Sequence, residues 1–144
     1  MSDTELDAAY RAAPYWFVPP TGEQVTIRCG QRCEPLDRLL AAAGVEHWAF
    51  VTACNPRSRR LAAAANRARM ARLGTVVRDR GFQSWPATGG DDSAVWPPEP
   101  SLLVLGMTEA EAVALGRAFE QNAILVGSRG TPSRLVWVDS PPPG

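Results

Sequence analysis

Asn55, Arg59 and Asn66 are polar residues whose spacing places them along one face of a predicted helix. The same face continues toward the C-terminus with apolar residues, as a core-directed stripe does. The stripe consists of Arg59, Ala62, Asn66, Met70, Leu73 and Val77. Polar groups directed at a core cost free energy unless they find partners. We therefore expect these three polar side chains to converge on a pocket. In the alternative interpretation, Asn55 caps the helix, Asn66 binds a loop backbone and Arg59 pairs with a carboxylate.

A strand followed directly by a helix would position these residues. The apolar run 48–51 (WAFV) predicts a buried strand. Asn55 and Pro56 predict a helix start, because Asn is a favoured N-cap and Pro fits the first helical position. The helix would continue to about Arg80, and the free N–H groups at its start favour an anion. The junction 52–59 is thus predicted to bind a small anionic ligand, either nucleotide-like or phosphorylated. The residues that would hold the anion are Asn55, Arg57, Ser58 and Arg59.

Three further residues could complete such a site. Glu99 lies in a proline-rich stretch, 96–101 (WPPEPS), which would hold its side chain in one place, so Glu99 is a candidate general base. It is equally a candidate ion-pair partner of Arg59. Gln121 and Asn122 come where a predicted helix gives way to a strand, and their amides could cap the helix or bind the donor and acceptor groups of a ligand. The sequence shows no recognisable pair of nucleophile and general base, so it does not decide whether the protein is an enzyme.

The cysteines and the single histidine do not form a recognisable metal site. Cys29 and Cys33 lack a second pair of ligands, and His47 alone cannot complete a zinc site. Cys54 is expected to be a buried, unreactive thiol. Three cysteines without a secretory signal indicate reduced thiols and a cytoplasmic location. We expect neither a metal nor a cofactor, since no phosphate-binding loop or dinucleotide-binding motif occurs.

Charge is balanced over the whole chain but not along it. The 15 basic residues are all Arg and are matched by 15 acids, and this balance disfavours a nucleic-acid partner. Eight Arg and one acid lie in 57–80. This Arg-rich helix is either a solvated basic face or, as the alternative to ligand binding, the contact surface of a protein–protein interaction module. No apolar run reaches the roughly 18 residues that a membrane span needs.

The order of the periodic segments predicts an α/β or α+β fold in a single domain, 1–144. Residues 1–14 would form an N-terminal helix, 15–17 an edge strand and 139–144 a frayed tail. Helices follow strands at several places, and parallel strands need such crossovers. We therefore expect a mixed, partly parallel sheet of about five or six strands with three or four helices packed on it.

Two helix ends are marked by local signals. Gly44 follows a helical segment and would end it in the left-handed conformation. Thr108 and Glu111 have the spacing of a capping box, which predicts a helix start.

Several stretches of the chain carry a family resemblance. They are 48–58 (WAFVTACNPRS), 66–67 (NR), 96–99 (WPPE) with 101–104 (SLLV), and 115–123 (LGRAFEQNA). They resemble a bacterial family catalogued as domain-of-unknown-function family 3293, and the resemblance extends over most of the chain, from about 15 to 137. The family has an aromatic residue where Cys54 stands, an acid where Ala65 stands and a glycine where Glu120 stands, so Cys54 is a poor candidate for a shared nucleophile. The resemblance implies no activity, but it includes the polar residues that the burial argument selects.

Overall fold

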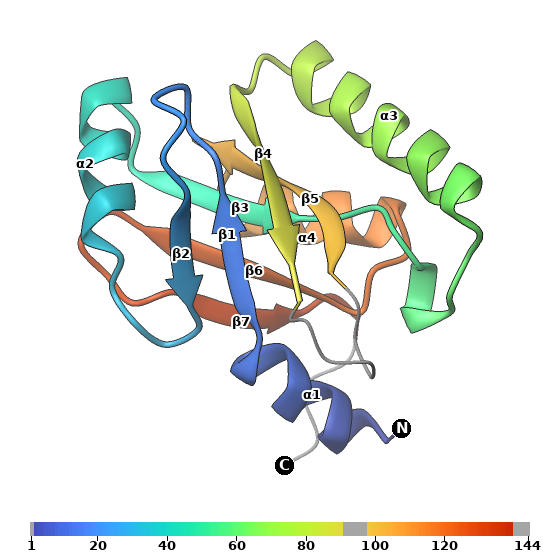
Figure 1. Cartoon of the computed structure of the whole chain (residues 1–144). Helices are drawn as coiled ribbons and strands as arrows, with labels where there is room; N and C mark the ends of the chain where they lie inside the picture. The colour runs from blue at the N-terminus through green and yellow to red at the C-terminus, as the bar shows by residue number, and fades with distance from the viewer. Residues whose placement is uncertain (1, 91–97, 140–144) are drawn as a thin grey trace.

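One curled antiparallel sheet forms the centre of the protein in a computed structural model of the chain (Figure 1). The structure describes residues 2–90 and 98–139, so Trp96 and the predicted tail beyond Asp139 lie outside the described residues. Within these residues the sheet has seven strands in the order β2-β1-β4-β5-β3-β6-β7. The strands are β1 Pro14–Phe17, β2 Val25–Arg28, β3 His47–Val51, β4 Ser84–Gly89, β5 Glu99–Leu105, β6 Ala123–Ser128 and β7 Arg134–Trp137.

Four α-helices and one short 3₁₀ turn accompany the sheet in the described part of the chain. They are α1 Asp3–Ala12, α2 Glu34–Ala43, η1 Pro56–Ser58, α3 Ala63–Asp79 and α4 Glu109–Ala118. Both locally marked helix ends are confirmed: Gly44 ends α2 with a φ of 72°, and Thr108 forms a capping box with Glu111 at the start of α4. None of these described helices is both long and apolar enough to cross a membrane.

The expected mixed, partly parallel sheet of five or six strands was wrong, because every neighbouring pair of strands is antiparallel. The helices α2, α3 and α4 do connect strands that run in the same direction. Those strands are never neighbours, however, since β5 lies between β3 and β4, and β3 lies between β5 and β6. Each inserted strand runs the opposite way. The strand at 14–17 is likewise not an edge strand, because β1 pairs with both β2 and β4.

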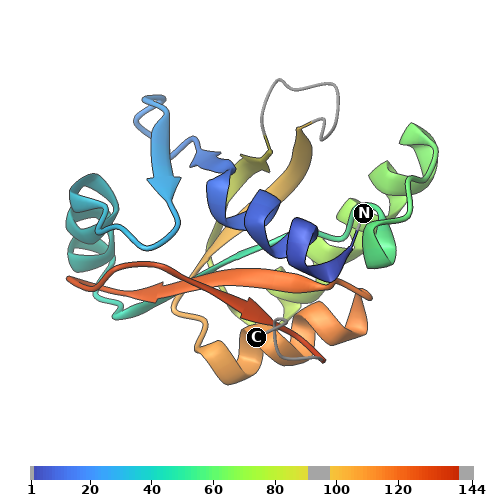
Figure 2. The same ribbon diagram turned by 90° about the horizontal axis from the view of Figure 1, so that it is seen from below.

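The two faces of the curled sheet carry separate cores. Figures 1 and 2 show α1 and α2 on the concave face and α3 and α4 on the convex face. Side chains of β3 alternate between the faces, as the pleat of a strand requires. Trp48 and Phe50 enter the concave core, whereas Ala49 and Val51 enter the convex one. The α2 helix adds Leu36 and Leu40 to the concave core, and α3 adds Leu73 and Val77 to the convex core.

The long helix begins later than the sequence predicts. α3 starts at Ala63 rather than at Pro56. The segment after Asn55 forms a 3₁₀ turn in which Arg57 has a φ of 52° and Ser58 a φ of 61°. An α-helix of L-residues does not continue through two left-handed positions. Asn55 is therefore not the cap of α3, and the free N–H groups of this helix do not lie where an anion was expected.

Candidate functional site

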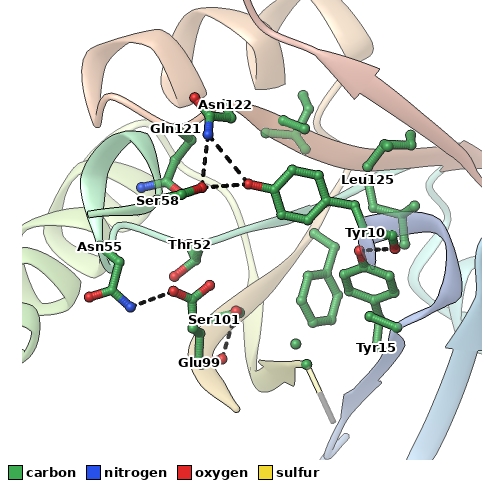
Figure 3. A pocket seen from close by; sticks show the side chains of 17 residues that line it. Tyr10, Tyr15, Thr52, Asn55, Ser58, Glu99, Ser101, Gln121, Asn122 and Leu125 are labelled. Atoms are coloured by element: carbon green, nitrogen blue, oxygen red, sulfur yellow. Dashed lines mark hydrogen bonds between the residues drawn. The ribbon is translucent and has the colours of Figure 1, made fainter. Parts of the chain in front are cut away.

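A partly enclosed polar cavity of about 60 Å³ lies at the α1 end of the concave face (Figure 3). It is lined by residues of α1, of six strands (β1 and β3 to β7) and of the segment 52–58. Glu99 is the one charged residue among the described residues that line it. The polar lining side chains are Tyr10, Tyr15, Thr52, Asn55, Ser58, Glu99, Ser101, Gln121 and Asn122.

The carboxylate of Glu99, the first residue of β5, is held by the side chain of Asn55. Asn55 Nδ2 donates to Glu99 Oε2 at 2.6 Å. The other end of the Asn55 amide is fixed as well, because its Oδ1 accepts from the backbone N–H of Leu61 and from Asn66 Nδ2, both at 2.9 Å. Asn66 Oδ1 in turn accepts from the backbone N–H of Asn55 at 2.9 Å. The second carboxylate oxygen of Glu99 lies on the cavity side (Figure 3).

Burial sets the electrostatics of Glu99. Loss of solvent raises the pKa of this carboxyl above its ordinary value, and the hydrogen bond from Asn55 opposes that shift. The ion pairs among the described residues all use other carboxylates. A mostly buried carboxylate without a cationic neighbour favours either its neutral form or a positively charged partner from outside the chain.

Three other side chains that line the cavity use their hydrogens within the protein. The hydroxyls of Thr52 and Ser101 donate to backbone carbonyls at 2.7 and 3.0 Å. Gln121 Nε2 donates to two backbone carbonyls at 3.1 and 3.2 Å. The Thr52 hydroxyl oxygen also accepts from the backbone N–H of Cys54 at 3.1 Å. Because the hydrogens of all three side chains are used, what remains for a ligand is acceptor capacity: the Ser101 hydroxyl oxygen, the Gln121 amide oxygen and the second lone pair of Thr52 Oγ1.

A second polar cluster lies across the cavity from Glu99 (Figure 3). Ser58 Oγ lies 2.8 Å from the Tyr10 hydroxyl and accepts from Asn122 Nδ2 at 2.8 Å. Asn122 Nδ2 also donates to the Tyr10 hydroxyl, at 3.4 Å. The Tyr15 hydroxyl donates to the backbone carbonyl of Tyr10. These bonds fasten α1 over the cavity and join it to η1 and to the start of β6.

Four non-glycine residues in the described part of the chain have a positive φ, and all lie in or next to segments that line the cavity. They are Asn55 (48°), Arg57 (52°), Ser58 (61°) and Glu120 (58°). The backbone N–H of Arg57 donates to the carbonyl of Glu120 at 2.7 Å, so the two strained segments bind each other. Such conformations cost on the order of 1–3 kcal/mol each and persist where long-range contacts hold them. The φ at position 120 also accounts for the glycine that the family resemblance implies there, because glycine adopts this conformation without steric cost.

Five predicted site residues from distant parts of the sequence meet in this cavity. They are Asn55, Ser58, Glu99, Gln121 and Asn122. Asn66 does not line it but stands behind Asn55 and binds the loop backbone, as the alternative interpretation described. Whether these residues bind a ligand stays a prediction.

Neither of the two predicted arginines lines the cavity. Arg57 donates to Asp139 at 2.7 Å and to the backbone carbonyl of Gln121 at 3.2 Å. Arg117 donates to the same carboxylate at 2.7 Å, and these two hydrogen bonds hold the pKa of Asp139 below its ordinary value. Arg59 is exposed and does not line the cavity. Among the described residues it forms no ion pair with Glu99.

Arg69 is the arginine that the sequence reasoning missed. Its Nε donates to the carbonyl of Ala53 and its Nη2 to the carbonyl of Phe119, each at 2.6 Å. Its Nη1 lies 3.6 Å from the Glu120 carboxylate. Arg69 thus joins the two chain segments whose ends line the cavity. Its position three residues after Asn66 is a helical spacing, so the same periodicity could have found it.

The reasoning from sequence did not single out Tyr10, Tyr15, Thr52 or Ser101, although Thr52 lies in the predicted junction 52–59. Tyr10 reaches the cavity only because α1 folds over the concave face. Thr52 directly follows β3, and Ser101 lies in the neighbouring strand β5. Their proximity follows from the strand order. No local sequence signal marks any of the four.

Neither the cysteines nor the histidine is among the residues that line the cavity. Cys54 is buried, as expected, and burial raises the pKa of its thiol. His47 is exposed, with Nδ1 3.2 Å from Ser128 Oγ. Among the described residues, no group of three or more His, Cys, Asp or Glu side chains could hold a metal ion.

The fold and site define a domain with a curled seven-stranded antiparallel sheet and a polar cavity under its N-terminal helix. The chain belongs to the family described as "Protein of unknown function (DUF3293)", whose profile matches residues 51–124, just over half of the chain. The resemblance seen in the sequence is therefore confirmed. The matched region contains every predicted site residue. No curated protein and no solved structure matches the chain.

Proposed function

We propose that the cavity binds a small polar molecule, or the polar end of a larger one. The observation that carries the proposal is the Glu99 carboxylate, which is mostly buried, held by Asn55 and directed at the cavity. A carboxylate that serves only stability is normally exposed or paired with a cation. Glu99 is neither, among the residues that the structure describes.

The size of the cavity restricts what can enter. One water molecule needs about 10–15 Å³ of such volume, so a cavity of about 60 Å³ takes roughly five water-sized groups. A whole nucleotide is too large, although one end of a larger molecule fits. Phe50, Leu125 and Leu135 add an apolar wall that would contact the carbon atoms of the ligand.

An anionic ligand was expected because a helix start and two arginines were placed at 52–59. α3 begins at Ala63 instead, and neither Arg57 nor Arg59 lines the cavity. The start of α3 borders a separate open groove, to which Arg60 and Arg67 contribute. An anionic ligand would therefore find its positive charge in that groove rather than beside Glu99.

The arrangement supports binding more directly than catalysis. Glu99 remains a candidate general base, because its raised pKa brings it closer to neutral pH. The side chain in contact with it is the Asn55 amide, however, and not a hydroxyl or thiol that it could activate. We therefore propose a binding site and assign no reaction.

The test is a fragment screen by two-dimensional NMR of amide resonances in the whole chain. Ligands should shift resonances of residues 52–58, 99–101 and 121–125, and Thr52→Val, which removes one hydroxyl with little change of shape, should weaken the hits. Arg59→Ala is the matched control and should leave them unchanged, since Arg59 is exposed and outside the cavity. The proposal would be contradicted if all hits shift resonances elsewhere in the chain, or if they bind the Thr52→Val variant as tightly as the wild type.

A second candidate function is favoured by the segregation of charge. Eight of the 15 Arg and one of the 15 acids lie in 57–80, which leaves seven Arg and 14 acids in the rest of the chain. α3 lies on the outside of the convex face (Figure 1), and Arg67 and Arg78 on it are exposed. An acidic protein surface would complement this helix.

The double variant Arg67→Glu with Arg78→Glu tests the interaction module by affinity capture. Arg72 is left unchanged, because its guanidinium lies 5.3 Å from the centre of the Phe119 ring and contributes to packing. A specific partner should be lost from the captured proteins, whereas Arg134→Glu on β7 should retain it. Equal recovery with the double variant would rule out this surface.

A further inference from the structure

We propose that the group that enters the cavity is a positively charged donor of several N–H bonds, namely the amidinium, guanidinium or primary ammonium end of a small molecule. This inference rests on the proposed function, because it assumes that the cavity binds a ligand. It adds the chemical class of that ligand.

The first step is the missing counter-charge of Glu99. Every Arg and the single His of the sequence lie within residues 2–90 and 98–139, so the structure describes all the basic side chains. In that part of the chain the arginines that form ion pairs do so with other carboxylates, and none pairs with Glu99. A buried ionised carboxylate without a partner is costly. A cationic ligand would supply the charge that the described residues do not.

The second step is the hydrogen-bonding character of the wall around Glu99. Thr52, Ser101 and Gln121 use their hydrogens on backbone carbonyls, so they offer oxygen acceptors. The nearest side-chain donor is Asn55 Nδ2, and it is engaged by Glu99. Thr52 Oγ1 already accepts from the backbone N–H of Cys54. A ligand that only accepts hydrogen bonds would give no partner to the Ser101 and Gln121 oxygens. A planar amidinium, with N–H groups pointing in several directions, satisfies more than one of them at once.

The third step is the shape of the rest of the cavity. The rings of Tyr15 and Phe50 also line it and pack edge to face, with centroids 5.3 Å apart. Carbon atoms attached to the charged group would contact these rings. Aromatic rings also tolerate a neighbouring cation, whereas they give an anion no stabilisation.

Acetamidinium, acetamide and acetate form a matched set of probes, because they share size and planar shape but carry positive, zero and negative charge. Each would be titrated into the whole chain at neutral pH while the amide resonances of residues 52–58, 99–101 and 121–125 are followed. Acetamidinium should bind about tenfold more tightly than acetamide, because both donate N–H bonds but only acetamidinium also forms an ion pair with the Glu99 carboxylate. Acetate should bind more weakly than either.

Glu99→Gln provides the decisive variant, since it keeps the shape of the side chain and removes its charge. Its affinities for acetamidinium and acetamide should agree within about twofold. The wild-type chain gives an independent measurement if this variant does not fold. As the pH is lowered and Glu99 takes up a proton, the preference for acetamidinium should disappear. Among the described residues, the Tyr15 phenol and the Cys54 thiol interact electrostatically with Glu99, and burial raises the pKa of each, so neither gains charge in that range.

Equal affinity for acetamidinium and acetamide at the cavity would overturn the inference while leaving the binding site in place. Tighter binding of acetate would overturn it too and would restore an anionic ligand. If none of the three probes shifts the cavity resonances, the cationic class is wrong. The fragment screen then decides separately whether the cavity binds anything at all.

Discussion

Asn55 donates from its amide nitrogen to the Glu99 carboxylate at 2.6 Å, across 44 positions of sequence. The orientation of this amide is determined by its surroundings, because Asn55 Oδ1 accepts from the backbone N–H of Leu61, which can only donate. Asn66 binds both the amide oxygen and the backbone N–H of Asn55. The position of Glu99, the one charged residue on the described wall of the cavity, therefore depends on a turn that is itself anchored to α3.

Asn55→Asp should destabilise the fold at neutral pH by about 1–3 kcal/mol. The new side chain keeps an acceptor for Leu61 but turns a second carboxylate oxygen toward Glu99. Chemical unfolding at several pH values measures the effect, which should shrink in acid as one of the two carboxyls is protonated. Gln24→Glu, at an exposed position, adds the same charge and should change the stability little. Equal losses for both variants would mean that the Asn55–Glu99 contact has no special role.

Glu99→Gln should gain stability relative to the wild type as the pH rises. Burial raises the folded-state pKa of Glu99 above 4.5, so the folded state disfavours the ionised form. Below the unfolded-state pKa both states are protonated and carry no penalty; above the folded-state pKa the penalty is complete. The difference in melting temperature between variant and wild type should therefore increase from about pH 4 upward. A difference that stays constant with pH would show that Glu99 ionises as readily in the folded chain as in the unfolded one.

Asp139→Asn should show the opposite dependence on pH. Hydrogen bonds from Arg117 and Arg57 lower the pKa of Asp139, so its contribution to stability is present above the unfolded-state pKa and is lost as the pH falls through the folded-state pKa. The variant should be less stable than the wild type at neutral pH and approach it in acid. Because this carboxylate is exposed, the effect should also weaken in salt. The same melting series, repeated at two salt concentrations, measures both trends.

Local signals in the sequence were sufficient for most helices and strands but not for their arrangement. The capping box of Thr108 with Glu111 and the stop at Gly44 act within a few residues, so the sequence displays them directly. The strand order depends on contacts between distant segments. Crossover helices correctly indicated strands of equal direction, yet nothing local revealed that an antiparallel strand lies between them.

The candidate site shows the same limit at Asn55 and Pro56. These residues are an ordinary signal for a helix start, and the backbone nevertheless turns left-handed at Arg57 and Ser58. The contacts that hold this turn come from far along the chain: Glu120 accepts from the backbone of Arg57, and Asn122 donates to Ser58. Burial reasoning selected Asn55 and Asn66, because buried polar groups must find partners, whereas the other predicted residues that line the cavity came from local signals along the chain. It could not tell which of the arginines faces inward.

Arg69→Met should cost about 1–3 kcal/mol of stability, whereas Arg59→Met should cost little. The Arg69 side chain is only 17% exposed and donates to two backbone carbonyls, which would lose their partners. Arg59 is exposed and does not line the cavity. Removing its charge therefore leaves no polar group of the cavity without a partner. Urea unfolding of the two variants under identical conditions measures the difference. Equal stabilities would mean that Arg69 does not clamp the segments at Ala53 and Phe119.

Gly127→Ala and Gly74→Ala should change stability in opposite directions. A Cβ at Gly127 would lie 2.5 Å from the indole ring of Trp48, its partner across β3 and β6, so the ring or the strand must move, at a cost of about 1–3 kcal/mol. Gly74 lies inside α3 with open space where its Cβ would be, and alanine there should stabilise the helix by about 0.8–1 kcal/mol. Thermal unfolding of the two variants measures both signs with the same chemical change. If Gly127→Ala is as stable as the wild type, the Trp48 ring does not lie as close to β6 as described. The packing of the concave core beside the cavity would then differ as well.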